Sequence, residues 1–248
     1  MATERAGRSS SAFHAATIRF PSVSALPAIV SRIRRAFDLD ADVAAICAHL
    51  SRDAVLDPLL AARPGLRAPG GWDGFEVGVR AILGQQITLE AGRKLAVQLV
   101  EVCTPAASMQ TTADVGLTHA FPLPAQVAAA DLRSMKMPNA RKEALVAWAK
   151  AALANPRLFE PLDSIEATVA QLRAIRGIGD WTAHYIALRS VREPDAFPAS
   201  DVALLRSVAK RSAPLDATQL LARAERWRPW RAYAAQHLWA ADARGDDG

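Results

Sequence analysis

The chain has 248 residues, a formal net charge of +5 and a hydrophobic content of 51%. This length allows one large or two small domains, and the apolar content is enough to bury a sizeable core. No run approaches the roughly 18 apolar residues that span a membrane, the start lacks the apolar core of a secretory signal, and two cysteines are too few for a four-cysteine metal cluster.

The N-terminal segment differs in composition from the rest of the chain. Residues 1 to about 12 are rich in Ser, Ala and Arg and are predicted to be disordered. The following HAATIRF, residues 14–20, alternates apolar and polar side chains and predicts one short strand that ends before Pro21. Because a single strand is not stable by itself, this strand either packs on helices or is the remnant of a larger sheet domain.

After Pro21, apolar residues recur at spacings of three and four, which is typical of amphipathic helices. The expected helices lie near residues 24–37, 41–50, 53–62, 73–84, 88–102, 124–136, 139–153, 164–175, 180–191, 200–211, 216–226 and 229–242. The Pro- and Gly-rich stretch 64–71 and the Thr-, Ala- and Pro-rich stretch 104–123 are expected to be loops. The predicted fold class is therefore all-α, with one short N-terminal strand.

The most informative segment is LRAIRGIGDWTAHY, residues 172–185. Its apolar residues close one helix, Gly177 and Gly179 bracket Ile178 in a tight turn, and a second helix begins directly afterwards. Glycine permits a positive φ and a close approach of a ligand to the backbone. Free amides at the start of the second helix would bind a phosphate well. These amides belong to Gly179, Asp180, Trp181 and Thr182.

The same letters also fit an ordinary corner between two helices with glycine caps. The full spacing from Leu172 through Ile175 to Thr182 instead favours a helix-hairpin-helix motif that binds DNA. The charge distribution agrees with a polyanionic partner, because residues 201–240 hold seven Lys and Arg against three Asp and Glu, a net charge of +4. A solvated helix surface would explain the same charge.

Asp201 lies 22 residues after Gly179, at the end of an irregular stretch that contains Pro198. It stands where a new helix begins, and apolar residues such as Leu204 and Val208 form the buried face of that helix. An Asp at this position is most often a helix cap, stabilised by the free N–H groups. The hairpin upstream makes a catalytic carboxylate the stronger interpretation.

A hairpin followed by an irregular loop, a Pro and a helix-starting Asp resembles the HhH-GPD superfamily of base-excision DNA glycosylases. Further segments are similar to its bacterial 3-methyladenine DNA glycosylase II (AlkA) branch: PGLRAPGGWDGFEVGVRAILGQQIT, MPNARKEALVAWAKAAL, GIGDWTAHYIALR and ERWRPWRAYAAQHLW. The likeness runs from about Ile29 to Ala240. We expect most of the β-rich N-terminal domain of that branch to be missing from this chain, which would keep only its final strand, Ala15 to Phe20, and the helix after it.

This resemblance implies that Asp201 is the catalytic residue in hydrolysis of an N-glycosidic bond. Departure of the base leaves an electron-poor sugar, and a nearby carboxylate stabilises that charge or orients the attacking water. An alkylated purine already carries positive charge and departs readily, so no strong general acid is required. Bifunctional members of the superfamily carry a lysine where this chain has Trp181, and an indole cannot form a Schiff base. We therefore expect base removal without strand cleavage.

The resemblance also implies an aromatic pocket for a base that is flipped out of the duplex. Core packing is the ordinary role of such rings, but three aromatic residues match the pocket of the branch: Trp181, Tyr185 and Trp239. The apolar wedge of the branch corresponds here to Gln86, followed by Ile87, and either could fill the gap in the DNA. Val202 replaces an aromatic residue after the acid, which leaves the substrate range open.

In this family the hairpin binds a DNA phosphate, often with a monovalent cation held by carbonyl groups of the turn. The carbonyls of Arg173, Ile175 and Ile178 would hold that cation here, and no other cofactor is required. The two histidines near these segments, His184 and His237, are expected to pack or to lie at the surface rather than to take part in catalysis.

We expect two helical lobes. Residues 1–20 form a tail with the remnant strand, 21–65 form helices that pack with the C-terminal lobe, 66–195 form the central lobe with the hairpin, and 196–248 form the C-terminal lobe with Asp201. The expected protein is a cytoplasmic, monomeric and monofunctional glycosylase that removes alkylated purines of the 3-methyladenine type from damaged double-stranded DNA. Two alternatives stay open: a glycosylase for an oxidised or mispaired base, and a non-catalytic helix-hairpin-helix DNA-binding protein.

Overall fold

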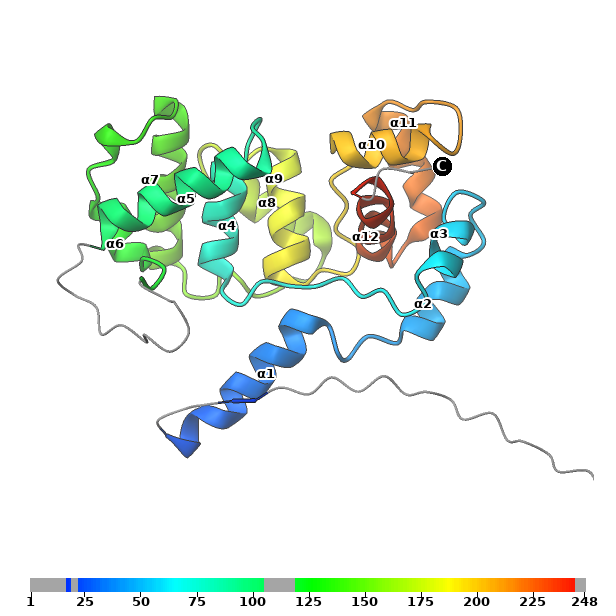
Figure 1. Cartoon of the computed structure of the whole chain (residues 1–248), viewed down its shortest axis with the longest axis horizontal. Helices are drawn as coiled ribbons and strands as arrows, with labels where there is room; N and C mark the ends of the chain where they lie inside the picture. The colour runs from blue at the N-terminus through cyan, green and yellow to red at the C-terminus, as the bar shows by residue number, and fades with distance from the viewer. Residues whose placement is uncertain (1–16, 19–21, 105–118, 244–248) are drawn as a thin grey trace, which may run out of the picture.

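The computed structural model describes residues 17–18, 22–104 and 119–243, and all regular structure in this part of the chain is helical (Figure 1). The predicted all-α fold class is thus confirmed. The strand expected at 14–20 lies outside the described residues except for Thr17 and Ile18, which belong to no regular element. The expected N-terminal tail and most of the expected loop 104–123 also lie outside them. Of the helices described, none is both long and apolar enough to cross a membrane.

The helices follow one another in the order in which the apolar spacing predicts them. The α-helices are α1 Leu26–Phe37, α2 Val43–Leu50, α3 Asp57–Ala62, α4 Gly74–Leu83, α5 Leu89–Cys103, α6 Pro124–Ala129, α7 Asn139–Ala154, α8 Ile165–Arg173, α9 Asp180–Ile186, α10 Val202–Ala209, α11 Ala217–Ala224 and α12 Arg231–Asp242. Shorter 3-10 turns are η1 Val23–Ala25, η4 Leu132–Ser134 and η6 Glu225–Trp227, and η5 Ala187–Val191 is a π-helical segment.

Helix α3 begins four residues later than the sequence pattern predicts, because the carboxylate of Asp53 makes hydrogen bonds that keep this residue out of the helix. Its carboxylate accepts a hydrogen bond from the Val55 amide at 2.8 Å, which turns the chain before the helix starts. The same carboxylate accepts from Arg223 at 2.6 Å and from the indole of Trp227 at 3.0 Å. These partners lie about 170 residues away in the chain, so local spacing cannot reveal them. Trp227 is 1% exposed and lies in the core.

The first group of helices, here called the central group, consists of α4 to α9 with η5 (Figure 1). Its middle is α4, which packs against α5, α7, α9 and η5. Gly78 of α4 makes room for the buried Trp148 of α7, because a Cβ on Gly78 would lie 2.1 Å from the indole ring. The Trp148 indole donates to the carbonyl of Phe75 at 3.0 Å, so the buried ring keeps a polar partner.

The second group, here called the C-terminal group, consists of α2, α3, α10, α11 and α12 (Figure 1). Helix α12 is its core, because α10 and α3 both pack on it. Its sequence places Ala234, Ala235 and Leu238 in fully buried positions. Small residues on this helix allow close helix packing, so the C-terminal group is held mainly by apolar contacts.

Helix α1 lies below the two groups and touches the segments that connect them (Figure 1). Arg35 donates to the carbonyls of Ser190 and Val191 at the end of the central group. Asp38, the residue after α1, pairs with Arg192 at 2.7 Å and accepts from the Ala68 amide at 3.1 Å. The end of α1 therefore fixes both connections between the groups.

Candidate active site

The turn between α8 and α9 has the geometry of a tight hairpin, and only one of its two glycines uses a positive φ. Gly177 has φ +85°, and a Cβ there would lie 2.3 Å from the Cβ of Ala144. Gly179 has φ −81°, a value that any residue adopts, so it does not use the positive φ that glycine permits. Ile178 between them is 5% exposed and packs into the core, which agrees with the sequence analysis.

Gly179 nevertheless leaves the backbone open to an approaching group. A Cβ built on it would meet nothing within 4 Å, so the space beside it belongs to solvent or to a ligand. Helix α9 begins at the next residue, Asp180, whose exposed carboxylate lies 3.5 Å from Arg173. The hairpin therefore presents accessible amides at a helix start, as the sequence pattern predicts.

The side chain of Thr182 does not belong to this open surface. It is 3% exposed, and its hydroxyl accepts a hydrogen bond from the Gln85 amide group at 3.0 Å. The hydroxyl of Thr182 is therefore turned away from an approaching phosphate, whereas the prediction made from the sequence concerns its backbone amide.

Gln85 holds the hairpin turn by hydrogen bonds, and the sequence analysis does not single it out. Its Nε2 donates to the carbonyl of Gly177 at 3.1 Å as well as to Thr182. Its own backbone carbonyl accepts from Arg141 at 2.6 Å. Gln85 therefore joins the end of α4 and the start of α7 to the hairpin turn. The two adjacent glutamines in GQQIT are the sequence feature that could have pointed to this contact. Which of the two faces inward depends on the tertiary packing.

The two predicted wedge residues lie differently. Gln86 has φ 55° and is exposed, so it stands at the tip of the turn between α4 and α5. Ile87 is half-buried and packs against the hydrophobic core. The exposure of the two side chains therefore favours Gln86 over Ile87 as the wedge that enters the DNA.

Asp201 is the N-cap of α10 and also accepts hydrogen bonds from two tryptophans. Its Oδ1 accepts from the amides of Ala203 at 2.9 Å and Leu204 at 3.1 Å, which is the cap that its position predicts. The indole of Trp239 adds a third bond to Oδ1 at 3.0 Å, and the indole of Trp181 donates to Oδ2 at 2.7 Å. Oδ1 therefore has three donors and Oδ2 has one, so Oδ2 keeps free acceptor capacity.

The structure brings the three predicted pocket aromatics together beside this carboxylate. Trp181 and Tyr185 stack with a centroid distance of 5.2 Å and an interplanar angle of 13°. Tyr185 and Trp239 meet edge to face at 6.3 Å. Trp181 and Tyr185 lie four residues apart on α9, whereas Trp239 comes from α12. The cluster therefore spans the central and C-terminal groups, with Asp201 bonded to both sides.

Arg189 completes this cluster, although no sequence motif singled it out. Its guanidinium lies 5.1 Å from the Trp239 ring centroid and 5.8 Å from that of Tyr185. It donates to the carbonyl of Pro69 at 2.7 Å and to Oε1 of Gln236 at 2.9 Å. Burial lowers the pKa of this guanidinium, which its interactions with Tyr185 partly offset. Arg189 thus fixes the rings from the side of the segment that connects α3 to α4.

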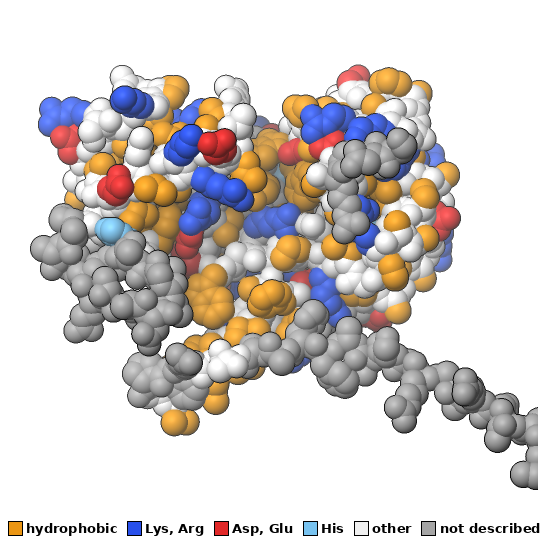
Figure 2. Space-filling view, in the orientation of Figure 1, with side chains coloured by type: hydrophobic (Ala, Val, Ile, Leu, Met, Phe, Trp, Pro, Cys, Tyr) orange, Lys and Arg blue, Asp and Glu red, His pale blue; other side chains and the backbone are white. Residues whose placement is uncertain are grey.

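Val202 follows Asp201 and is 69% exposed. Its side chain points away from the core, so the substitution of an aromatic residue by Val changes the surface next to the acid rather than the packing behind it. Figure 2 shows a hollow between the two groups of helices, with Lys and Arg side chains gathered along it. A polyanion that enters this hollow would meet a positive surface.

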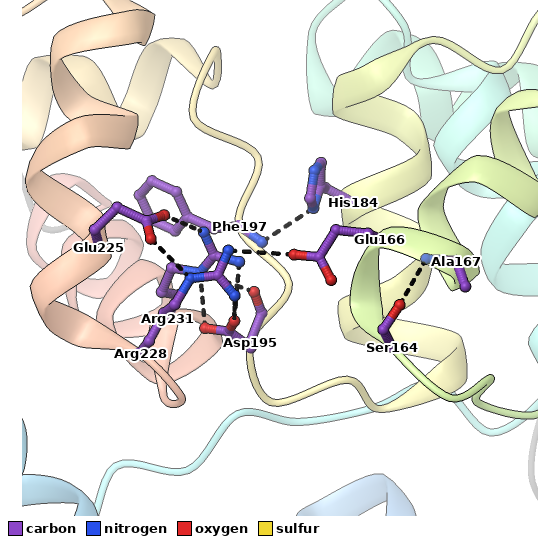
Figure 3. Close-up of polar contacts among 9 residues, drawn as sticks. All are labelled: Ser164, Glu166, Ala167, His184, Asp195, Phe197, Glu225, Arg228 and Arg231. Atoms are coloured by element: carbon purple, nitrogen blue, oxygen red, sulfur yellow. Dashed lines mark hydrogen bonds and ion pairs between the residues drawn. The ribbon is translucent and has the colours of Figure 1, made fainter.

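On another side of α9, a network of charged residues joins the two groups (Figure 3). Arg231 of α12 is 3% exposed and donates to Asp195 at 2.7 Å, in the segment that leads to Asp201. Arg228 pairs with Asp195 as well and reaches Glu166 of α8 at 3.3 Å. The Arg228–Glu166 pair crosses from the C-terminal group to the central group, and the pairs with Asp195 hold the segment before Asp201 in place.

The two histidines have structural roles. Nδ1 of His184 accepts a hydrogen bond from the Phe197 amide at 3.2 Å, four residues before Asp201 (Figure 3). Burial lowers the pKa of His184, and the same cause lowers the pKa of His237, which is 1% exposed. Neither ring contacts Asp201 in the described structure, which agrees with the packing roles expected for both.

The sequence is similar to known DNA repair proteins along most of its length. The model of the AlkA N-terminal domain family matches residues 4–73, a longer stretch than the strand at Ala15 to Phe20 and the following helix that the sequence analysis assigned to that domain. The DNA-3-methyladenine glycosylase 2 of Escherichia coli is 36% identical over 213 residues, which are 85% of this chain and 70% of that protein. A probable bifunctional transcriptional activator/DNA repair enzyme AlkA of Mycobacterium tuberculosis is 37% identical over 209 residues. That match covers 84% of this chain, which spans 42% of the length of the relative.

Solved structures share the fold. The 3-methyladenine DNA glycosylase from Archaeoglobus fulgidus superposes with a TM-score of 0.76 at 22% identity, over 90% of this chain and 77% of that one. The Schizosaccharomyces pombe 3-methyladenine DNA glycosylase Mag1, solved in complex with abasic DNA, superposes with a TM-score of 0.60 at 23% identity, over 78% of this chain and 94% of that one. The arrangement of helices around Asp201 is therefore that of a known glycosylase fold.

Proposed function

Because the chain belongs to the AlkA family of DNA-3-methyladenine glycosylases, we propose that it hydrolyses the N-glycosidic bond of alkylated purines of the 3-methyladenine type in duplex DNA. The observation that carries this proposal is the carboxylate of Asp201, which is bonded to the indoles of Trp181 and Trp239 between the two groups of helices. Such removal of a damaged base is the first step of base-excision repair.

Asp201 is the group that acts on the sugar. As the base departs, positive charge develops on the sugar ring, and a fixed carboxylate stabilises it without rearrangement. Oδ2 has a single donor, Trp181, so this oxygen can face the sugar or accept a proton of the attacking water. The three bonds to Oδ1 hold the carboxylate in orientation during the reaction. Because an alkylated purine leaves readily, the step needs no protonated side chain at the base.

Trp181 supports base removal without strand cleavage. It stands where bifunctional relatives would carry the lysine that forms a Schiff base, and its indole N–H is already used by Asp201. The described hydrogen-bond donors to Asp201 are two indoles and two backbone amides, and none of them is an amine that could form a Schiff base. Treatment with borohydride during base release should trap no covalent protein–DNA adduct, whereas a lyase control should give one.

The hairpin and the turn before α5 supply the contacts to DNA in this proposal. The open amides beside Gly179 bind a backbone phosphate, and Gln86 fills the gap left by the flipped base. The turn carbonyls of Arg173, Ile175 and Ile178 are the ligands for a monovalent cation. The Ile175 carbonyl accepts from the Ile178 amide at 3.1 Å and keeps a second lone pair, which fits such a role.

The decisive experiment measures single-turnover release of 3-methyladenine from methylated duplex DNA by the wild type and by Asp201→Asn. We expect a loss of roughly 100-fold or more in the variant, because an amide cannot stabilise the charge on the sugar. Asp216→Asn is the matched control, since Asp216 also caps a helix, accepting from the Gln219 amide at 2.8 Å, but lies at the start of α11. Release by the control should equal that of the wild type.

Three other outcomes would contradict the proposal. Equal release by the wild type and Asp201→Asn would remove Asp201 from its role. Release from oxidised or mispaired duplexes, but not from methylated DNA, would assign the site to another lesion. Tight DNA binding with no release of any base would make the chain a DNA-binding module.

A further inference from the structure

The guanidinium of Arg189 is the unexplained group in the aromatic cluster. It lies over the rings of Trp239 and Tyr185, at 5.1 and 5.8 Å from their centroids. A ring face is the negative part of an aromatic side chain and attracts a cation. In this protein, Arg189 already places one cation over these two rings.

The charge of Arg189 is held in place but not neutralised by contact. It donates to the carbonyl of Pro69 and to the side-chain amide of Gln236 and also interacts with the side chain of Tyr185, and none of these partners is a carboxylate. No carboxylate in the described part of the chain lies within ion-pair distance of it. Asp201 is bonded to the indole N–H groups of Trp239 and Trp181, at the ring edges rather than over a face. The cluster thus carries one negative charge at the ring edges and one positive charge over the ring faces.

We propose that Arg189 determines specificity by charge: it weakens the selection of positively charged damaged bases and admits neutral ones. This inference rests on the proposed function. Asp201 and the ring faces attract a cationic base such as 7-methylguanine, whereas the half-buried guanidinium of Arg189 repels it. A neutral base such as hypoxanthine feels neither effect strongly. The ratio of the two excision rates therefore depends on whether position 189 is charged.

The test compares single-turnover excision of 7-methylguanine and of hypoxanthine, each placed in the same duplex sequence. Arg189→Gln removes the charge and keeps hydrogen-bonding groups, while Arg189→Lys keeps the charge. We expect Arg189→Gln to raise the ratio of 7-methylguanine to hypoxanthine excision by roughly three- to tenfold relative to the wild type. Arg189→Lys should leave the ratio within about twofold, even if both rates fall.

A purely structural role for Arg189 gives a different result. Loss of the contacts to Pro69 and Gln236 would lower both rates together in both variants and leave the ratio unchanged. An unchanged or lowered ratio in Arg189→Gln, or an equal rise in Arg189→Lys, would overturn the inference.

Position 236 offers a second route that keeps Arg189 in place. Gln236→Glu would put a carboxylate 2.9 Å from the guanidinium and cancel its charge, whereas Gln236→Met removes only the hydrogen bond. We expect the ratio to rise in Gln236→Glu and to stay unchanged in Gln236→Met. The inference fails if Gln236→Glu leaves the ratio of the two excision rates unchanged. This variant also tests the inference if Arg189→Gln does not fold. If the wild type releases neither base nor 3-methyladenine, the proposed function itself fails, and the inference fails with it.

Discussion

The indole N–H of Trp181 donates a 2.7 Å hydrogen bond to Oδ2 of Asp201. Trp181 lies in the first turn of α9, directly after the hairpin, and Asp201 begins α10 in the C-terminal group. The bond therefore joins the hairpin to the acid across the two groups of helices. In the proposed function, this bond fixes the distance between the hairpin, which binds the duplex, and Asp201, which acts on the sugar.

Trp181→Phe should lower base release without lowering DNA affinity. Phenylalanine keeps a ring that stacks on Tyr185 but cannot donate to Asp201. A hydrogen bond to a charged group contributes about 1.5 to 3 kcal/mol, so we expect single-turnover release to fall roughly ten- to hundredfold. Trp227→Phe is the matched control, because Trp227 donates to Asp53 at 3.0 Å in the core. That control should lower the free energy of unfolding and leave the rate constant for base release unchanged. Equal losses of release in both variants would contradict a specific role for the Trp181 bond.

The two hairpin glycines should respond differently to alanine. Gly177→Ala introduces a side chain at φ +85° and 2.3 Å from Ala144, so we expect the free energy of unfolding to fall by about 2 to 4 kcal/mol. Gly179→Ala meets no protein atom within 4 Å and should keep normal stability. It should instead weaken DNA binding, since the new methyl group lies where the phosphate approaches the amides. Urea unfolding and fluorescence anisotropy with labelled duplex measure the two effects. The prediction is wrong if Gly179→Ala binds DNA as the wild type does.

The wedge residue can be identified by comparing Gln86→Ala with Ile87→Ala. Gln86 is exposed, so its loss should leave stability within about 0.5 kcal/mol while base release falls. Ile87 packs against the core, so its loss should lower the free energy of unfolding by about 1 kcal/mol or more. Measurement of excision and unfolding for both variants checks this assignment. A normal excision rate in Gln86→Ala, with a large loss in a folded Ile87→Ala, would reverse it.

Stability should fall as the pH is lowered through the ordinary titration range of histidine. Burial lowers the pKa of both His184 and His237 below the ordinary value of 6.5, so the unfolded chain binds more protons than the folded one. The free energy of unfolding is therefore highest above about pH 6.5. It falls progressively as the pH is lowered below that value, by at most about 1.4 kcal/mol per pH unit and histidine. Urea unfolding at several pH values measures the slope.

His184→Gln tests the contribution of one ring to that slope. A glutamine oxygen can still accept from the Phe197 amide, as Nδ1 of His184 does at 3.2 Å, but it does not titrate. Four charged residues also act on this ring and remain in the variant: Asp180, Arg231, Arg173 and Asp195. We expect a shallower pH dependence of stability between about pH 5 and 6.5 than in the wild type. An unchanged slope would show that His184 keeps its ordinary protonation in the folded protein.

The sequence by itself determined the features that depend on local spacing. Apolar residues at intervals of three and four predicted the succession of helices, and the glycine spacing predicted the hairpin. The position of Asp201 predicted both a helix cap and a catalytic acid, and the structure shows the cap with its two backbone donors. The predictions of the helices, the hairpin turn and the cap succeed because residues within one turn of a helix determine them, whereas the catalytic role of Asp201 stays a prediction.

Only the tertiary structure decided which distant side chains meet at the site. Gln85 reaches Gly177 across 92 residues, and Arg189 reaches the Pro69 carbonyl across 120 residues. Trp239 reaches Asp201 from the last helix, and Thr182 turns inward because Gln85 is there to meet it. Such contacts depend on how whole helices pack, which no local pattern encodes. The chemistry expected of Asp201 could thus be read from its neighbours in the chain, whereas the charge and shape of the pocket around it could not.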